Sequence, residues 1–214
     1  YTLKVRNRYL WDGDLAEARA TLDAMPDGVS IRALWFRGFH ELFERNYAAA
    51  IDMLDARRDE TYQTHAQTIP LSLVIAWAHE GAGDDAGAAR AYREALAIHE
   101  AARAERPDDF RIVMALALTQ AGLGNADEAI RLADRGVEMY PIEKDAWAGP
   151  IVARNRVLAL TRAGAYDAAL DQIEALLASP NPGASPALFR VDPRLDPLRE
   201  HPRFEQLLAG AAAP

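Results

Sequence analysis

The sequence predicts an all-α protein in which about five helical hairpins stack into a superhelix that ends in a proline-rich cap. Three observations carry this prediction. The 214 residues include 44 alanines and 24 leucines but 8 valines and 10 isoleucines, and alanine favours helices whereas β-branched residues favour strands. One short motif recurs five times with a period near forty residues. Six of the twelve prolines lie between residues 180 and 202, where they exclude a long helix before Phe204.

The recurring motif is a turn residue followed five residues later by an alanine. The turns are at residues 13, 45, 83, 124 and 164, and the alanines are Ala18, Ala50, Ala88, Ala129 and Ala169. Glycine, present at four of these turns, suits the left-handed end of a helix, and the Asp or Asn that follows at positions 14, 46, 84 and 125 can cap the next helix. An alanine permits two helices to cross closely. Each unit is therefore expected to be a helix, a tight turn and a second helix.

This pattern places ten helices along the chain. They are expected over residues 2–12, 15–25, 30–44, 47–58, 70–81, 85–105, 109–122, 126–139, 148–163 and 166–178. Longer connections are expected within residues 57–69, 100–107 and 142–150, because the period is longer there. Residues 1–178 are thus predicted to form the helical repeat domain.

After residue 178 the composition changes, and residues 179–208 are predicted to form the capping segment, followed by a disordered tail over residues 209–214. The cap should cover the exposed apolar face of the last hairpin, as the terminal caps of helical solenoids do. Its expected anchors are Leu188, Phe189, Val191, Leu195, Leu198 and Phe204.

Charge and composition exclude several classes of function. Lys and Arg number 24 against 32 Asp and Glu, a net charge of −8, which argues against nucleic-acid binding through this domain. The sequence has no cysteine and no apolar run near the roughly 20 residues that span a membrane. Cytoplasm and periplasm both remain open as compartments. Because the sequence begins at Tyr1, we expect it to be a piece of a longer protein.

No motif indicates catalysis. His40, His79 and His99 each precede a glutamate, but none has the second histidine four residues on that a zinc helix needs, so we interpret them as solvated polar faces of helices. The short glycine pairs near residues 81 and 122 follow helical stretches, not strands, and no phosphate-binding loop is present. Paired carboxylates occur where they cap helices. We therefore expect no catalytic residue, no metal site, no cofactor and no enzyme activity in this chain.

The repeat resembles the tetratricopeptide repeat. The fourth unit fits best, with Ala117, Gly124, Ala126, Ala129, Gly136 and Pro141 at the positions that this family uses for small residues and proline. The second unit departs from the family pattern with Arg45 in place of the turn glycine. The resemblance implies a right-handed superhelix whose first helices line a concave groove that binds a protein or peptide partner.

A second resemblance covers roughly residues 70–208. The string Asp192-Pro-Arg, Asp196-Pro-Leu-Arg and His201-Pro-Arg-Phe is similar to the C-terminal tetratricopeptide region of large bacterial signalling proteins. In these, the repeats follow a serine/threonine kinase, a winged-helix regulator or a cyclase-like effector. The resemblance implies that the partner could be the protein's own effector domain, and a homodimer is equally compatible with it.

By the family's register, a set of residues on the first helices should face the groove: Arg32, Trp35, Phe39, Trp77, Arg111, Met114, Arg154 and Leu158. Exposed aromatic anchors beside arginines are suited to a peptide that carries a carboxylate. The alternative is that Trp35, Phe39 and Trp77 are core between hairpins. The expected function is a protein-interaction scaffold. Its rivals are a small-ligand sensor, which an enclosed pocket with convergent polar groups would favour, and a dimerisation module.

Overall fold

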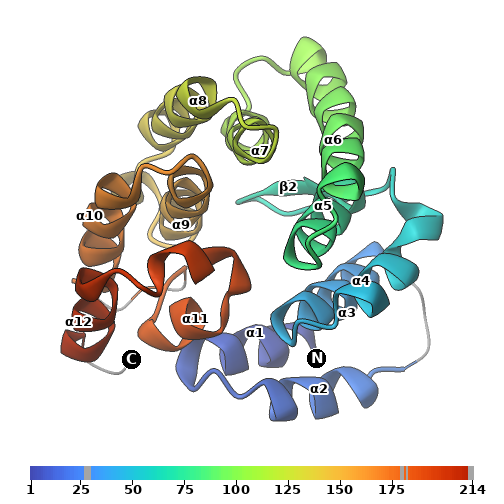
Figure 1. The fold of residues 1–214 in the computed structure, drawn as a ribbon, viewed down its shortest axis with the longest axis horizontal. Helices are drawn as coiled ribbons and strands as arrows, with labels where there is room; N and C mark the ends of the chain where they lie inside the picture. Colours follow the sequence, from blue (N-terminus) through green and yellow to red (C-terminus); the bar gives the residue numbers. More distant parts are fainter. Residues whose placement is uncertain (27–29, 179–180, 182, 212–214) are drawn as a thin grey trace.

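The structure, a computed structural model, describes residues 1–26, 30–178, 181 and 183–211 (Figure 1). Within these residues ten helices pair in chain order into five hairpins. They are α1 (Thr2–Trp11) with α2 (Leu15–Asp23), α3 (Ile31–Phe43) with α4 (Tyr47–Leu54), α5 (Leu71–Gly81) with α6 (Asp85–Glu105), α7 (Phe110–Gly122) with α8 (Ala126–Met139), and α9 (Ala148–Arg162) with α10 (Tyr166–Leu177). The 3₁₀ turns η1 (Asp55–Arg57) and η2 (Ile142–Lys144) follow α4 and α8. The prediction of an all-α helical-repeat superhelix is confirmed.

The five predicted turns share one backbone conformation. Their turn residues have positive φ angles: 68° at Gly13, 63° at Arg45, 73° at Gly83, 81° at Gly124 and 79° at Gly164. Glycine adopts this left-handed conformation without steric cost, and it ends the first helix of each pair. Arg45 is the one non-glycine residue with positive φ among the described residues.

The predicted helix caps are present at two of the four turns that have an Asp or Asn. The carboxylate of Asp14 accepts a hydrogen bond from the backbone N–H of Glu17, and that of Asp84 from Gly87, both at 2.9 Å. Asn46 and Asn125 make no such bond. Their side-chain amides donate instead to side chains at the end of the preceding helix, so the prediction was wrong for these two residues.

The repeated alanines lie at close helix crossings, as predicted. Ala18, Ala50, Ala129 and Ala169 are completely buried, and Ala88 is 6% exposed. Other close approaches use glycine: a methyl group on Gly122 would lie 2.1 Å from the ring of Tyr92, and one on Gly81 would lie 2.5 Å from the ring of Tyr47. Tyrosines from the second helix of one hairpin thus fit over glycines at the end of the next first helix.

The loop predicted after α4 contains a small β-hairpin. Strands β1 (Thr61–Gln63) and β2 (Thr68–Pro70) pair antiparallel, with Tyr62 opposite Ile69. Both of these side chains are buried, and the pairing satisfies backbone groups that a buried loop would leave without partners. The hairpin turn is held to α7 because Arg111 donates a 2.9 Å hydrogen bond to the carbonyl oxygen of Thr64.

The C-terminal cap consists of three short helical segments, α11 (Pro186–Val191), the 3₁₀ helix η3 (Pro193–Leu198) and α12 (Pro202–Gly210). Each begins with proline, which lacks the N–H that a first helical residue leaves unused. Of the expected anchors, Val191 is half-buried and the rest are at most 4% exposed: Leu188, Phe189, Leu195, Leu198 and Phe204.

The end of the cap differs from the expected boundary. The disordered tail was expected from residue 209, but Ala209 and Gly210 complete α12. The expected cap began at residue 179 and the expected tail ended at residue 214. Within these two segments, residues 179, 180, 182 and 212–214 lie outside the described residues.

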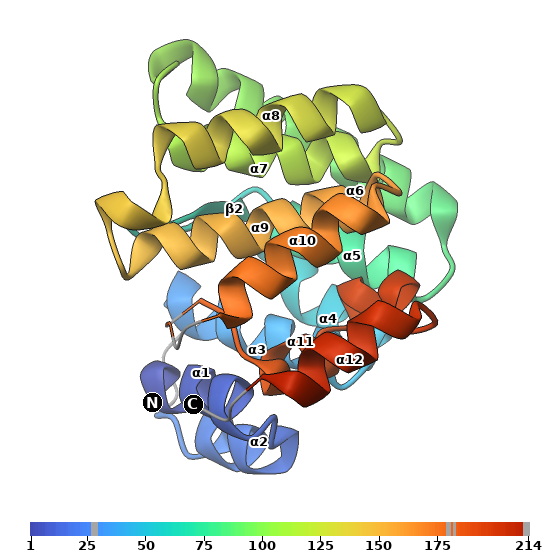
Figure 2. The ribbon, with the colours of Figure 1, turned by 90° about the vertical axis from the view of Figure 1, so that its left-hand side faces the viewer.

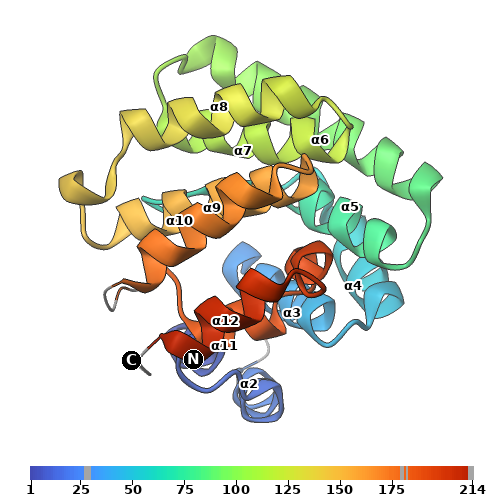
Figure 3. The ribbon, with the colours of Figure 1, turned by 60° about the vertical axis from the view of Figure 1, so that its left-hand side comes forward.

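The cap also reaches further than predicted. As expected, α12 packs on α10 of the last hairpin, but α11 packs on α1, and η3 packs on α9 and α5 (Figures 1 and 2). The superhelix curves so strongly that its first and last hairpins lie on either side of the cap, which Figure 3 shows from another direction. The cap therefore crosses the concave side and closes the superhelix into a ring.

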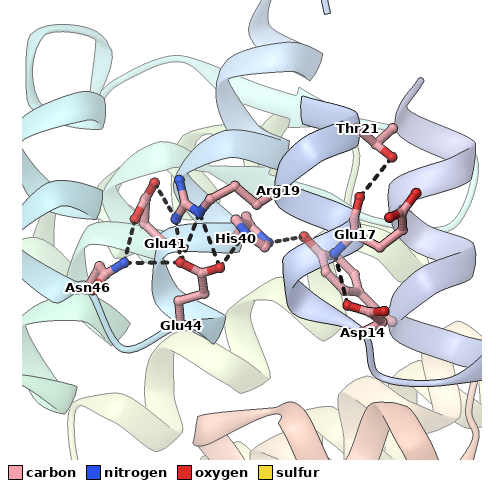
Figure 4. A network of polar contacts seen from close by, with 9 residues as sticks. Asp14, Glu17, Arg19, Thr21, His40, Glu41, Glu44 and Asn46 are labelled. Carbon is pink, nitrogen blue, oxygen red and sulfur yellow. Dashed lines mark hydrogen bonds and ion pairs between the residues drawn. The ribbon is translucent and has the colours of Figure 1, made fainter. Parts of the chain in front are cut away.

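A buried polar network joins the first two hairpins (Figure 4). Arg19 of α2 reaches Glu41 at 2.9 Å and Glu44 at 2.5 Å, both at the end of α3. His40 donates from Nε2 to Glu44 at 3.0 Å, and the hydroxyl of Tyr9 donates to its Nδ1, also at 3.0 Å. Burial lowers the pKa of His40, so the neutral form that this pattern requires is favoured.

The interpretation of these three histidines as solvated was wrong. His40 and His99 are each 1% exposed, and His79 is largely buried beside Asp84, 2.9 Å away. His99 faces α7, where its Nδ1 shares a hydrogen bond of 3.1 Å with the hydroxyl of Thr119. The glutamate that follows each histidine in the sequence gave no indication of this burial, because neighbouring side chains point in different directions from a helix.

Candidate binding cavities

Four of the predicted groove residues line one cavity on the concave side. This cavity, which we call the arginine cavity, has a volume of about 300 Å³. Arg32, Trp35 and Phe39 reach it from α3, and Arg154 reaches it from α9. The structure thus brings together side chains that are more than one hundred positions apart in the sequence. Further walls come from α1, the tip of the β-hairpin and the cap.

Two other predicted residues, Trp77 and Leu158, line a second cavity of about 310 Å³. Arg111 and Met114 line neither of these cavities. The guanidinium of Arg111 binds Asp109 at 2.6 Å and the β-hairpin turn. Met114 is buried against Gly136 of α8, inside its own hairpin.

The aromatic wall of the arginine cavity is a stack centred on Trp35. Its ring lies 4.6 Å from that of Phe39 and 4.6 Å from that of Tyr62, with interplanar angles of 13° and 24°. Trp35 and Phe39 are each 7% exposed, and Tyr62 is 6% exposed. These side chains are therefore buried between elements and line the cavity at the same time. Stacking on both sides holds the indole in place, which makes the wall rigid.

Arg194 of the cap separates the two cavities and lines both. Its guanidinium lies 4.8 Å from the ring of Phe39 and 4.5 Å from the ring of Trp77. Asp192 binds the same guanidinium through two hydrogen bonds of 2.8 and 2.6 Å. Two of the predicted aromatic anchors are thus already in contact with the chain's own C-terminal segment.

The charge of the arginine cavity is strongly unbalanced. Four arginines line it, namely Arg6, Arg32, Arg154 and Arg194, and no Asp or Glu does so among the described residues. Arg194 has its partner in Asp192, whereas no ion pair forms between the other three and any described carboxylate. Burial, and then the positive charges of Arg194 and Arg6, lower the pKa of Arg154 to about 10. Arg154 still carries its charge at neutral pH, but at a cost in free energy.

Three buried N–H donors at this cavity have no hydrogen-bond partner: Nε of Arg6, Nε of Arg154 and Nε1 of Trp35. Arg154 makes one hydrogen bond, from Nη1 to the carbonyl oxygen of Gly183 at 3.2 Å. Buried donors without an acceptor are rare in folded proteins and destabilise them. These three atoms have almost no accessible surface, so a group in the cavity could bind them only after the side chains moved.

The second cavity contrasts with the first because its charges are paired. Arg45 binds Asp196 through hydrogen bonds of 2.6 and 2.8 Å, and Arg162 forms an ion pair with Glu80. Glu80 also accepts a 2.6 Å hydrogen bond from the hydroxyl of Tyr92. Arginines on this side of the molecule are thus neutralised by the chain itself.

Arg6, Tyr62, Trp147 and Arg194 are among the lining residues that sequence reasoning missed. Arg6 lies on α1 and stacks on the ring of Trp147 at 4.3 Å, where the cavity opens. The groove register was applied to the first helices of the second to fifth hairpins, and Arg6, Tyr62 and Arg194 lie on other elements. Trp147 directly precedes one of these first helices, α9. Arg194 belongs to the Asp-Pro motif around residues 192–199, but the motif gave no indication that this segment lies in the groove.

Within the described part of the chain, no group of three or more His, Asp or Glu side chains is arranged to hold a metal ion. In the same residues, no helix has the length and apolar character needed to span a bilayer.

Comparison with known proteins gives one family match, over part of the chain. Residues 86–148 match the model of the tetratricopeptide repeat, and this segment comprises α6, α7, α8 and the start of α9. The match includes most of the fourth predicted unit, the one with the best fit to the repeat pattern. No curated protein and no solved structure matches the chain. Tetratricopeptide repeats generally are non-catalytic and bind protein partners.

Proposed function

We propose that this chain is a non-catalytic interaction domain that binds a partner protein on its concave side, as the regulatory part of a larger bacterial signalling protein. One observation carries the proposal: Arg32, Trp35, Phe39 and Arg154, which the repeat register assigns to the groove, line one cavity in the folded chain. The tetratricopeptide match over residues 86–148 supports a role in binding. The resemblance of residues 70–208 to bacterial signalling proteins supports the regulatory context.

The chemistry of the site indicates what part of a partner would bind. Arginines without carboxylate partners favour an anionic group, and the aromatic wall favours an apolar group beside it. The cap occupies part of the concave side, so the partner inserts one short anchor into the cavity and does not lie along the whole groove. The protein's own effector domain is the first partner to test.

The experiment is a calorimetric titration of this chain with the purified effector domain of the full protein. Arg32→Gln and Arg154→Gln should each weaken binding at least tenfold, because both side chains line the cavity. Arg131→Gln is the matched control, since Arg131 is exposed on α8 and bound only to Glu128 at 2.6 Å. Equal affinity of all three variants would contradict the proposed groove.

A second candidate function is a sensor that binds a small ligand and controls the effector. The enclosure of the cavity favours it: α1, the β-hairpin tip and the cap add walls that an open groove would lack. The unpaired arginines favour it as well, because an anionic ligand would supply the counter-charge that no described carboxylate provides at this cavity.

A further inference from the structure

The arginine cavity differs from its neighbour in a way that identifies a ligand class. Both cavities are of similar volume, and each is lined by several arginines. In the second cavity Asp196 and Glu80 neutralise Arg45 and Arg162. In the arginine cavity, Arg6, Arg32 and Arg154 have no described carboxylate within ion-pair distance. A protein of net charge −8 has acidic residues to spare, so this unbalanced site is suited to an external anion.

The unpaired arginines show where the anion binds. Arg6 and Arg154 both line the cavity without a carboxylate partner among the described residues, and the positive charges of Arg194 and Arg6 act on Arg154. A guanidinium can offer two N–H groups side by side, which matches the two oxygens of a carboxylate. A carboxylate between Arg6 and Arg154 would relieve the repulsion between the two charges.

The remaining wall shows what the anion is attached to. Trp35, Phe36, Phe39 and Tyr62 form a buried aromatic wall, in which Phe39 and Tyr62 cover the two faces of the Trp35 ring. Inorganic phosphate would leave this surface uncovered, whereas a flat apolar body would fill the space beside it. The volume of about 300 Å³ is at the lower end of the range for small-molecule pockets.

We propose that the arginine cavity binds a small organic carboxylate with a flat aromatic body of one or two rings. The carboxylate lies between Arg6 and Arg154, and the rings lie against the edges of the aromatic wall. This inference rests on the second candidate function, the ligand sensor, and gives its ligand class. The exposed side chains of Leu3, His65 and Trp147 mark the mouth through which the ligand enters.

The test is a titration of the intact chain followed by calorimetry and by tryptophan fluorescence, because Trp35 and Trp147 both line the cavity. The probes are benzoate, 2-naphthoate and indole-3-acetate, each compared with its neutral amide, and inorganic phosphate. At least one acid should bind at least tenfold more tightly than its amide, and phosphate should bind more weakly than that acid. Equal binding of acid and amide, preference for phosphate, or no binding at millimolar concentration would each overturn the proposal.

Substitutions then locate the site. Arg154→Gln and Arg6→Gln should each weaken binding of the acid at least tenfold and leave binding of the amide unchanged, while Arg131→Gln should leave both unchanged. If Arg154→Gln does not fold, Arg6→Gln decides, because Arg6 is only half-buried near the mouth. Acid binding that is the same in Arg6→Gln and in wild-type protein would place the ligand elsewhere.

The same protein preparations separate this inference from the partner-binding proposal. If the effector domain binds and no aromatic acid does, the ligand class is wrong and partner binding stands. If an acid binds and depends on Arg6 while the effector domain fails to bind, the chain is a ligand receptor and the partner proposal is wrong.

Discussion

Arg45 and Asp196 are 151 positions apart in the sequence, and they form an ion pair with two hydrogen bonds, of 2.6 and 2.8 Å. Arg45 occupies the turn between α3 and α4, with the left-handed backbone that the other four turns assign to glycine. Its side chain crosses the concave side to the cap. The residue that departs from the repeat pattern is thus the one that fastens the cap to the second hairpin.

The first prediction follows from the two opposing effects at Arg45. A left-handed non-glycine residue costs about 1–2 kcal/mol, whereas the pair, with Arg45 48% exposed, is screened by solvent to less than about 1 kcal/mol. Arg45→Gly should therefore leave the free energy of unfolding in urea unchanged or raise it by about 1 kcal/mol. In this variant the backbone amides of residues 186–199 should nevertheless exchange hydrogen faster than in the wild type, because the pair with Asp196 is lost.

Arg45→Ala is the control for this prediction, because it loses the pair and keeps the unfavourable backbone. It should be less stable than Arg45→Gly and should show the same faster exchange in the cap. If the two variants are equally destabilised, backbone strain at residue 45 does not contribute.

The second prediction concerns the helix crossing at Ala129, which is completely buried. Ala129→Leu should overpack this crossing and lower the free energy of unfolding by about 1–3 kcal/mol. Ala97→Leu is the matched control, since Ala97 is exposed in the middle of α6. Urea unfolding of both variants checks the prediction, and similar stability of the two would contradict the hairpin register.

The third prediction concerns the cap. A chain that ends at residue 178 should aggregate or melt at a lower temperature, because it exposes the buried faces of Leu158, Leu170 and Ile173 at roughly 25 cal/mol for each Å². A milder variant, Phe189→Ala, should lower the free energy of unfolding by about 3–5 kcal/mol, since this ring is 1% exposed. Light scattering and thermal melts measure both effects. A truncated chain that is monomeric and equally stable would show that the cap is a linker.

The fourth prediction concerns pH. Burial lowers the pKa of His99 to about 4, from 6.5 in the unfolded chain. Between these values the unfolded state binds a proton that the folded state does not, so stability is complete above about pH 6.5 and falls as the pH drops to about 4. The loss from this residue amounts to about 3 kcal/mol. Burial shifts the pKa of His40 in the same direction and adds to the slope.

Chemical denaturation between pH 4 and pH 8 measures this dependence. His99→Leu should reduce the slope, while His65→Gln should leave it as in the wild type, because His65 is exposed. A slope that is identical in His99→Leu and in the wild type would show that His99 is not the group responsible.

The helices and turns of this protein could be predicted because their signals are local. A turn residue and an alanine five positions later determine where one helix ends and how closely the next can approach, and all five alanines are buried. Ends of helices were predicted to within a few residues; the helix expected to reach residue 58 ends at Leu54 and continues as a 3₁₀ turn.

The site could be predicted only in part, because several of its residues lie on elements to which the groove register was not applied. Trp35 and Arg154 follow from the groove register, and both line the arginine cavity. Arg6, Tyr62 and Arg194 come from α1, the β-hairpin and the cap, whose positions depend on how far the superhelix curves. That curvature is a sum of small rotations between neighbouring hairpins, and no single stretch of sequence contains it.

The closed ring has a consequence for how the chain unfolds. In an open array of repeats each unit contacts only its neighbours, so the ends fray and stability is lost one unit at a time. Here α11 of the cap lies against α1 and α12 of the cap lies against α10, so the first repeat cannot open without disturbing the cap that covers the last one. We expect a single cooperative transition instead of stepwise melting, and slower folding than in a linear array, because a loop of nearly the whole chain must close before these contacts form.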